Sequence, residues 1–343
     1  MKRGLVTLNT DETPREAYWD RLAALQARLQ ETNSGLALIY GDVSRSGDIN
    51  YLTNLCLYWN EAILAVPATG KPALITKLSK RVQPWMKKIS VLEDIRSGPR
   101  LGENIGRLLD DRAGTRETRI MIVDAPWWPN PVMSEVRQAL PGARFEDGGS
   151  AVRDTRLVPS PVEARLLERA ACLLEEGVQA AWQEGKNDHD RTALAVRSIR
   201  RAGFADASVT CRTSSDGSEH IDAIGQYRYV WARLAQPKGG AMADVANSAL
   251  KAAAARIMPG VTERMLNVIV QGQVARQFPC TFWCIPHPDI ETRGLFRSVT
   301  NRERRLRDGE VVSLTVCVAG KADAVTASRM LRVRSTGPEA LAN

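Results

Sequence analysis

His220 is the side chain with the clearest capacity for acid/base chemistry in this sequence of 343 residues. The unperturbed pKa of histidine lies near neutrality, so an imidazole can accept and release a proton at physiological pH. Three carboxylates lie close to it along the chain and can orient it or stabilise its charged form: Asp216, Glu219 and Asp222. The alternative is a loop histidine among solvated neighbours, and the residues alone leave both interpretations open.

His287 is a second candidate for proton transfer. It lies between Pro286 and Pro288, which restrict the backbone and can hold an imidazole in place. A structural hydrogen bond to a nearby carbonyl is the alternative. Cys280 becomes a nucleophile only if a neighbouring imidazole lowers the pKa of its thiol, whereas buried cysteines more often serve as inert packing.

The cysteine pattern argues against a disulfide framework and against a zinc site. Six cysteines in a long chain without a secretory signal indicate reduced thiols. A zinc site normally shows a CxxC pair, and the sequence has none. The residues that such a site would need are Cys280, Cys284, His287 and Cys317. We therefore expect no structural zinc at these residues, and we expect no cofactor.

Composition describes an ordinary globular protein, with 44% hydrophobic and 25% charged residues and a net charge of +8. Part of the basic excess is clustered at Arg293, Arg297, Arg302, Arg304, Arg305 and Arg307. The cluster lacks a repeated interleaving of aromatic residues and any known nucleic-acid motif, so we expect a solvated loop and no nucleic-acid binding. The first apolar stretch is too short for a signal peptide, and no run reaches the length needed to span a bilayer, which favours the cytoplasm.

Elements that could position these residues follow from hydrophobic periodicity and capping patterns. Thr13 followed by Pro14 predicts the start of an amphipathic helix. Short apolar runs bounded by Gly, Pro or Asp predict strands at 35–41, 61–68 and 72–77 and at RIMIVDA. Strands alternating with helices predict an α/β N-terminal domain that ends near Gly149.

The second half predicts an α+β domain. Ser160 is a candidate cap for a long amphipathic helix, and further helices are expected at 189–202, 241–257 and 262–277. Strand-like segments lie between and after them at CRT, YRYVWARLA, VVSLTVCVA and ASRMLRVRS. Since the chain is longer than one core usually organises, we expect two domains, 1–152 and 153–343, with a linker around 150–160.

Several motifs, in the right order, resemble those of the creatinase, prolidase and methionine aminopeptidase family. They are Asp48–Thr53, similar to NIxYLTG; Arg153–Glu163, similar to RxxKSPxE; Ile257–Thr262, similar to IxPGxT; and Asp308–Leu314, similar to PGMVVSME. The resemblance implies an α/β creatinase-like N-terminal domain followed by an α+β, shortened pita-bread domain. Ser214–His220 resembles the NTDGAH segment of creatinase, the member that works without metal, and this resemblance places the acid/base role on His220. A second histidine of the family, which follows its GHSFG turn, aligns with His287.

The departures from the family pattern concern its metal ligands. Thr315 and Ser328 stand where two metal-binding glutamates would fall, and Cys280 stands in place of a metal-binding histidine. The strand that carries two metal-binding aspartates is expected to be missing after His220. Neutral Cys, Thr and Ser donors would leave a divalent cation poorly compensated, so the resemblance implies a site without metal.

The resemblance also alters the expected substrate contacts. Creatinase holds a guanidinium with glutamates that correspond here to Ala232 and Ser328, and its partner subunit lends an arginine that falls near Asn60 and Glu61. A guanidinium-carboxylate ligand would lose both ion pairs, so creatine is not the expected substrate. The candidate substrate-binding residues are Tyr58, Trp59, Glu61, Asp222, Arg233, Cys280, Thr315 and Ser328.

Two functions are compatible with this pattern. The first is a metal-independent enzyme in which His220 and His287, assisted by Glu219 and Asp216, act on a small polar substrate by hydrolysis, elimination or cyclisation. Its cleft would be completed by the N-terminal domain of the second subunit of a homodimer. The alternative is a catalytically silent binding or scaffold protein, in which the two histidines would lie apart.

Overall fold

The computed structural model describes residues 6–111, 119–274, 278–292 and 303–342. Its contacts divide the chain into two compact units: the first ends at Thr155 and the second begins at Arg156. The α6 helix (Ala151–Arg156) contains this boundary. Across the part of the chain that the structure describes, no helix has the length and the apolar character needed to cross a bilayer.

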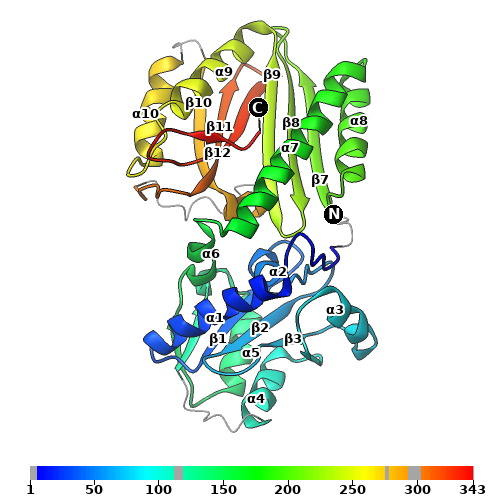
Figure 1. Cartoon of the computed structure of the whole chain (residues 1–343), viewed down its shortest axis with the longest axis vertical. Coiled ribbons are helices and arrows are strands. Elements are labelled where there is room, and N and C mark those ends of the chain that lie inside the picture. Colours follow the sequence, from blue (N-terminus) through cyan, green and yellow to red (C-terminus); the bar gives the residue numbers. More distant parts are fainter. Residues whose placement is uncertain (1–5, 112–118, 275–277, 293–302, 343) are drawn as a thin grey trace. The chain divides into compact units, whose positions relative to one another are not determined.

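The first unit is built on a six-stranded sheet with the order β4-β3-β2-β1-β5-β6 (Figure 1). The strands are β1 (Leu36–Gly41), β2 (Ala62–Pro67), β3 (Ala73–Thr76), β4 (Asp94–Ser97), β5 (Arg119–Val123) and β6 (Arg144–Asp147). β1 pairs antiparallel with β2 and parallel with β5, so the sheet is mixed. This confirms the α/β class expected for the first half of the chain.

The helices of the first unit are α1 (Arg15–Glu31), α2 (Gly47–Thr53), α3 (Gln83–Ile89), α4 (Leu101–Asp111) and α5 (Asn130–Ala139). Two short 3-10 segments, η1 (Lys80–Val82) and η2 (Ala125–Trp127), lie between them. α4 and α5 bury Leu101, Ile105 and Val136 against apolar side chains of the sheet. The predicted cap Thr13 is wrong, because α1 begins at Arg15 with Pro14 as its N-cap residue and no side-chain capping bond.

The second unit contains a seven-stranded sheet with the order β10-β11-β12-β9-β8-β7, in which β13 also pairs with β12. The strands are β7 (Asp206–Thr213), β8 (Glu219–Tyr227), β9 (Val230–Lys238), β10 (Cys280–Pro286), β11 (Val311–Ala319), β12 (Ala324–Arg332) and β13 (Glu339–Ala340). All of its pairings are antiparallel. The strand predicted at VVSLTVCVA is confirmed as β11.

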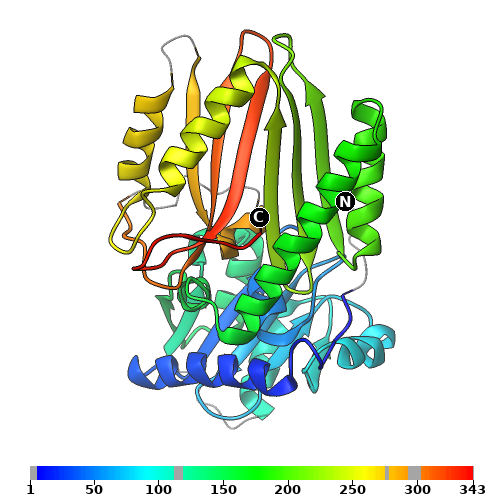
Figure 2. The same cartoon turned by 45° about the horizontal axis from the view of Figure 1, so that its top comes forward.

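Four longer helices accompany this sheet: α7 (Pro161–Glu184), α8 (Asp188–Arg201), α9 (Gly240–Ala254) and α10 (Glu263–Gln273). α7 and α9 lie over the same face of the sheet in both views (Figures 1 and 2). The predicted caps Ser160 and Thr262 are confirmed, since their hydroxyl oxygens accept hydrogen bonds from the backbone of Glu163 and Met265. A 3-10 segment, η3 (His287–Thr292), follows β10.

The sheet of the second unit has two chemically different faces, because side chains alternate along each strand. One face carries Leu314, Val316 and Ala327, which join a hydrophobic core with Ala246 and Leu266 of the helices. We call this the helix face. The other face, which we call the polar face, carries His220, Asp222, Arg233, Ser313, Thr315 and Ser328.

Two sequence interpretations are corrected at this level. His220 belongs to strand β8 and not to a loop, and β8 forms a complete hairpin with β9, so no strand is missing after His220. In the basic cluster, Arg293, Arg297 and Arg302 lie outside the described residues. Arg304 is paired with the buried carboxylate of Glu310 at 2.6 Å.

Candidate functional site

The polar face is assembled by the register of neighbouring strands. Asp222 of β8 is opposite Ala235 of β9, Ala235 is opposite Ser328 of β12, and Ser328 is opposite Thr315 of β11. Residues directly opposite in an antiparallel sheet share a face. The row therefore brings three of the predicted substrate-binding residues, Asp222, Ser328 and Thr315, onto the face that also carries His220.

His220 is the most reactive group on this face. Its side chain is 5% exposed, and its Nδ1 atom has no hydrogen-bond partner. Burial lowers the pKa of His220, while the nearby carboxylate of Asp222 opposes this shift. The imidazole is therefore neutral at pH 7, and in the tautomer with its proton on Nε2 the Nδ1 atom offers a lone pair to a proton donor.

Asp222 and Arg233 form an ion pair beside His220. Arg233 Nη2 donates to Asp222 Oδ2 at 2.8 Å. The side chain of Arg233 is 12% exposed and that of Asp222 is 21% exposed. Asp222 Oδ1 and Arg233 Nε are buried without a partner. A polar ligand at this position could therefore satisfy one donor and one acceptor that the protein leaves unpaired.

A ladder of hydroxyl groups continues the polar face. Ser328 Oγ lies 2.9 Å from Thr315 Oγ1 and 3.1 Å from Ser313 Oγ, and it donates to the carbonyl of Leu314. All three hydroxyl-bearing side chains are at most 1% exposed. We call Ser313, Thr315 and Ser328 the hydroxyl ladder. Its uncharged hydroxyl groups are hydrogen-bonded to one another and to the backbone.

The donor set of the polar face does not fit a divalent cation. Thr315 and Ser328, which stand in place of two carboxylates, are uncharged and already hydrogen-bonded to each other. Among the described residues, no group of three His, Cys, Asp or Glu side chains is placed to hold a metal ion. A cation bound at the ladder would lack charge compensation.

His287 lies outside the strands that form the polar face. It is the first residue of η3, which follows β10 and packs against β9 and β11 as well as β10.

The surroundings of His287 show a structural role. The residue is 1% exposed, and its Nε2 atom lies 2.6 Å from the carbonyl oxygen of Arg156. Burial, reinforced by the charge of Arg156, lowers the pKa of His287 to about 3. These contacts favour the alternative interpretation of His287, a structural hydrogen bond to a carbonyl, and its catalytic role stays a prediction.

Asp216 and Glu219 do not point to His220. Asp216 accepts hydrogen bonds from the backbone of Ser218 and of Met242 in the first turn of α9, and these bonds hold its pKa low although burial acts in the opposite direction. Glu219 alternates with His220 along β8, so it lies on the helix face, where it pairs with Arg191 of α8 at 2.7 Å. Both carboxylates have structural partners.

Cys280 is also placed away from His220. It alternates with Thr281 along β10 and packs against the core of the helix face. Burial raises the pKa of its thiol to about 11. A thiol with a raised pKa is a poor nucleophile at neutral pH, so the structure disfavours the nucleophilic role considered for Cys280.

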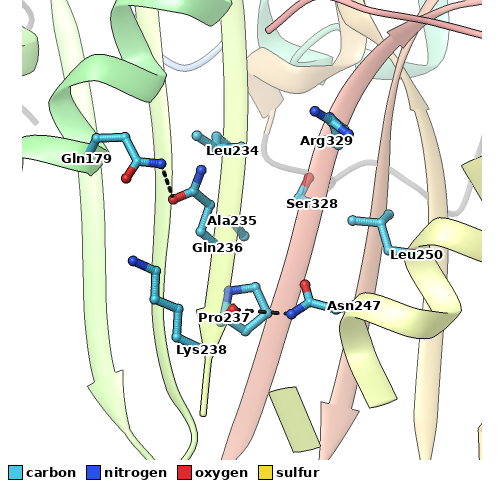
Figure 3. A pocket seen from close by; sticks show the side chains of 10 residues that line it. All are labelled: Gln179, Leu234, Ala235, Gln236, Pro237, Lys238, Asn247, Leu250, Ser328 and Arg329. Carbon is cyan, nitrogen blue, oxygen red and sulfur yellow. Dashed lines mark hydrogen bonds between the residues drawn. The ribbon is translucent and has the colours of Figure 1, made fainter. Parts of the chain in front are cut away.

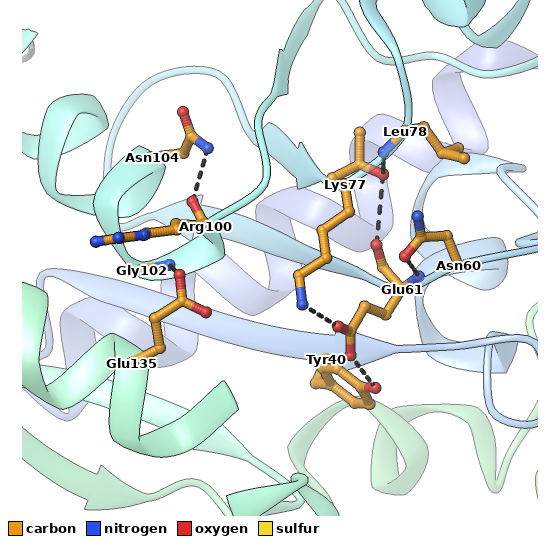
Figure 4. A network of polar contacts seen from close by, with 10 residues as sticks. Tyr40, Asn60, Glu61, Lys77, Leu78, Arg100, Gly102, Asn104 and Glu135 are labelled. Atoms are coloured by element: carbon orange, nitrogen blue, oxygen red, sulfur yellow. Dashed lines mark hydrogen bonds and ion pairs between the residues drawn. The ribbon is translucent and has the colours of Figure 1, made fainter. Parts of the chain in front are cut away.

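Three of the predicted substrate-binding residues, Tyr58, Trp59 and Glu61, belong to the first unit. Glu61 accepts hydrogen bonds from Lys77 and Tyr40 at 2.6 Å and 2.7 Å (Figure 4). Burial opposes ionisation of Glu61, but these bonds outweigh it and lower its pKa. Trp59 is 49% exposed, its ring stacks on Trp85 at a centroid distance of 5.9 Å, and Tyr58 contacts both rings.

Sequence reasoning missed Ser313 and the pairing of Asp222 with Arg233. The alternation of Ser313, Leu314 and Thr315 along a predicted strand was a usable signal, because every second residue of a strand shares a face. The distance between Asp222 and Arg233 required the β8–β9 hairpin register, in which Asp222 is opposite Ala235.

Comparison with known proteins supports the architecture. No protein-family model matches the chain, and no curated protein matches its sequence. Among solved structures, an X-Pro aminopeptidase from Thermotoga maritima MSB8 superposes with a TM-score of 0.77 at 14% identity, covering 94% of this chain and 97% of that one. A prolidase from Pyrococcus horikoshii OT3 gives 0.74 at 14% identity, with 94% and 98% covered.

A third solved structure, the dipeptidase PepE from Mycobacterium ulcerans, gives a TM-score of 0.70 at 18% identity and covers 96% of both chains. The two-unit chain thus has the fold of the creatinase and prolidase family, an α/β domain followed by a pita-bread domain. The resemblance inferred from the motifs is confirmed at the level of the fold.

Proposed function

We propose that this chain is a metal-independent enzyme of creatinase-like fold that acts on a small polar substrate through His220 alone. The observation that carries the proposal is the buried Nδ1 atom of His220, which has no partner in the protein and faces the same side of the sheet as Asp222. The peptidase and prolidase activities named for similar structures favour a hydrolase.

The residues of the polar face can supply proton transfer and the binding of a negatively charged oxygen. The neutral imidazole of His220 can take a proton from water or from a substrate carbon, and the resulting imidazolium can return that proton to a leaving nitrogen. Arg233, oriented by Asp222, can bind a substrate oxygen that gains negative charge. Hydrolysis and elimination at a carbon–nitrogen bond both need a proton to be moved from water or carbon to the leaving nitrogen.

The test uses purified protein and a panel of small amides, dipeptides and amidines. We expect His220→Gln to lower turnover about a hundredfold or more, as is typical for loss of a general base. His189→Gln removes an exposed histidine of α8 and serves as the matched control. Unchanged turnover in His220→Gln, or one equivalent of tightly bound metal by elemental analysis, would contradict the proposal.

A catalytically silent binding protein is the second candidate. The observation that favours it is the hydroxyl ladder, whose members are buried and hydrogen-bonded to each other instead of to a ligand. Ligand binding on the panel without any turnover would support this candidate. Turnover that depends on His220 would exclude it.

We further propose a cytoplasmic homodimer in which the first unit of one subunit completes the site of the other. The exposed ring of Trp59, together with Tyr58, supplies apolar surface that a second subunit could cover. We expect Trp59→Ser to weaken the dimer in analytical ultracentrifugation and to leave the thermal unfolding of the monomer nearly unchanged. A wild-type protein that is monomeric at micromolar concentration would contradict this arrangement.

A further inference from the structure

A cavity lies on the helix face of the sheet, whereas the imidazole of His220 lies on the polar face. It occupies about 320 Å³ between α7 and α9, above the seam where β9 meets β12 (Figure 3). Its lining consists of Gln179, Leu234, Ala235, Gln236, Pro237, Lys238, Asn247, Leu250, Ser328 and Arg329. We call it the seam groove, and none of the functions considered above uses it.

The groove exists because the sheet opens at this seam. β9 and β12 are joined by a single ladder pair, Ala235 with Ser328. Pro237 follows on β9 and has no N–H group to donate to a neighbouring strand. Its carbonyl instead accepts a hydrogen bond from Asn247 Nδ2 of α9 at 3.3 Å. The opening between the strands is therefore a consequence of the local sequence.

The charge of the groove is positive. Lys238 and Arg329 line it, and no Asp or Glu is among its lining residues. Lys238 Nζ lies 4.5 Å from the ring centroid of Trp182 of α7, a cation-π contact that restricts the ammonium group. Arg329 donates to the carbonyl of Ala342 through one Nη atom, which orients its guanidinium.

A carboxamide adds a neutral donor. Gln179 Nε2 donates to Gln236 Oε1 at 3.2 Å, and Figure 3 shows this bond linking α7 to β9. Since the oxygen of Gln236 is used by this bond, its Nε2 group is the part that remains to bind a ligand. Two cations and an oriented amide N–H group form a donor set suited to the oxygens of an anion.

We propose that the seam groove binds a small oxyanion, held by Lys238 and Gln236 of β9, with Arg329 further along the groove adding positive charge. A carboxylate and a phosphate ester share this chemistry, and the cavity volume fits a small molecule instead of a macromolecule. A bound anion contacts β9 through Gln236 and Lys238, whose side chains in turn contact Gln179 and Trp182 of α7.

The experiment measures binding of inorganic phosphate and of succinate to the full-length protein by calorimetry at low ionic strength. We expect saturable binding of at least one probe, and preference between the two identifies the source of the oxyanion. Gln236→Glu keeps an acceptor for Gln179 but replaces the donor amide by a carboxylate. We expect it to weaken binding about tenfold or more, and we expect a similar loss for Lys238→Gln.

The control is Lys251→Gln, which removes an exposed positive charge of α9 that is not in the lining. Its binding should equal that of the unaltered protein. Equal affinities for Gln236→Glu and the control, or no saturable binding of either probe in the millimolar range, would overturn the proposal. His220→Gln should leave anion binding unchanged, so failure of this site and failure of the proposed catalytic function are distinguishable.

Discussion

At the residue scale, the two histidines that looked equivalent along the chain have different chemistry. Both imidazoles keep an Nδ1 atom that is buried without a hydrogen-bond partner, but His220 lies next to the carboxylate of Asp222, whereas Nε2 of His287 is bonded to the carbonyl of Arg156. Burial lowers the pKa in both cases. The two histidines differ in the hydrogen bond that His287 makes to the backbone, because a ring nitrogen bonded in this way is held in place and has a structural role.

The lowered pKa of His287 predicts a pH dependence of stability. Between its folded value of about 3 and an unfolded value near 6.5, the unfolded chain binds the proton more strongly. The free energy of unfolding therefore contains a contribution that is complete above pH 6.5 and is lost as the pH falls. We expect a loss of roughly 1 kcal/mol per pH unit below pH 6.

His287→Gln tests this contribution, since glutamine can donate to the Arg156 carbonyl but does not titrate in this range. Urea unfolding at pH 5, 6 and 7 should show a flatter pH dependence for His287→Gln than for the unaltered protein. The exposed His189→Gln should retain the original slope. Identical slopes for all three proteins would show that His287 does not carry the effect.

A second residue-scale prediction concerns the buried ion pair between Arg156 and Glu163. Their side chains are 3% and 1% exposed, and Nε lies 3.6 Å from Oε1. Removing Glu163 takes a carboxylate from beside the buried guanidinium of Arg156, so we expect Glu163→Ala to lower the free energy of unfolding by about 3–5 kcal/mol. The double variant Arg156→Met with Glu163→Leu should be less destabilised than the single one. Equal destabilisation would mean that lost packing, not the loss of the opposite charge, dominates.

At the element scale, the turn before β8 is a cap for α9. Asp216 accepts from the backbone of Met242, and Ser218 Oγ accepts from the backbone of Ala243, so both satisfy first-turn N–H groups of α9. The negative charge of Asp216 also complements the helix dipole. Asp216 therefore serves to join the β7–β8 turn to a helix of the other half of the sheet.

Asp216→Ala tests this assignment. We expect a loss of about 1–2 kcal/mol in the free energy of unfolding, the usual cost of removing a capping carboxylate. We also expect turnover per folded molecule to change little, in contrast to His220→Gln. Asp216→Asn keeps an acceptor and should recover part of the stability. A variant that is fully stable but inactive would return Asp216 to a catalytic role.

At the scale of the whole molecule, each unit has its own apolar core. Ile122 belongs to the core of the first unit and Leu314 to that of the second, and both are at most 2% exposed. Separate cores favour separate unfolding transitions. The expectation can be tested without any assumption about how the two units are arranged.

We expect Ile122→Ala and Leu314→Ala each to cost about 2–5 kcal/mol and to act on different transitions. Differential scanning calorimetry should show the lower-temperature shoulder moving in one variant and the remaining peak moving in the other. Ala substitutions at exposed positions of the same units, Lys88 and Met265, provide controls. A single transition that shifts equally in both core variants would indicate that the units unfold together.

Local sequence was enough to predict features that depend on near neighbours. Apolar periodicity and capping residues predicted β11, the start of α7 at Ser160 and the start of α10 at Thr262, because these depend on bonds within a few residues. The ordered motifs were enough to predict the two-domain creatinase-like fold. The replacement of two glutamates by Thr315 and Ser328 could also be recognised from the sequence alone.

Tertiary structure alone decided which reactive residues share a site. His220 and Glu219 are neighbours in sequence but lie on opposite faces of β8, whereas Ser328 and Thr315 meet across two strands. The carbonyl that binds His287 lies 131 residues away. Such contacts depend on strand register and on chain segments that fold back from far away. Residue type and spacing therefore identified the candidate groups, but only their placement on the sheet could separate a free imidazole from a structural one.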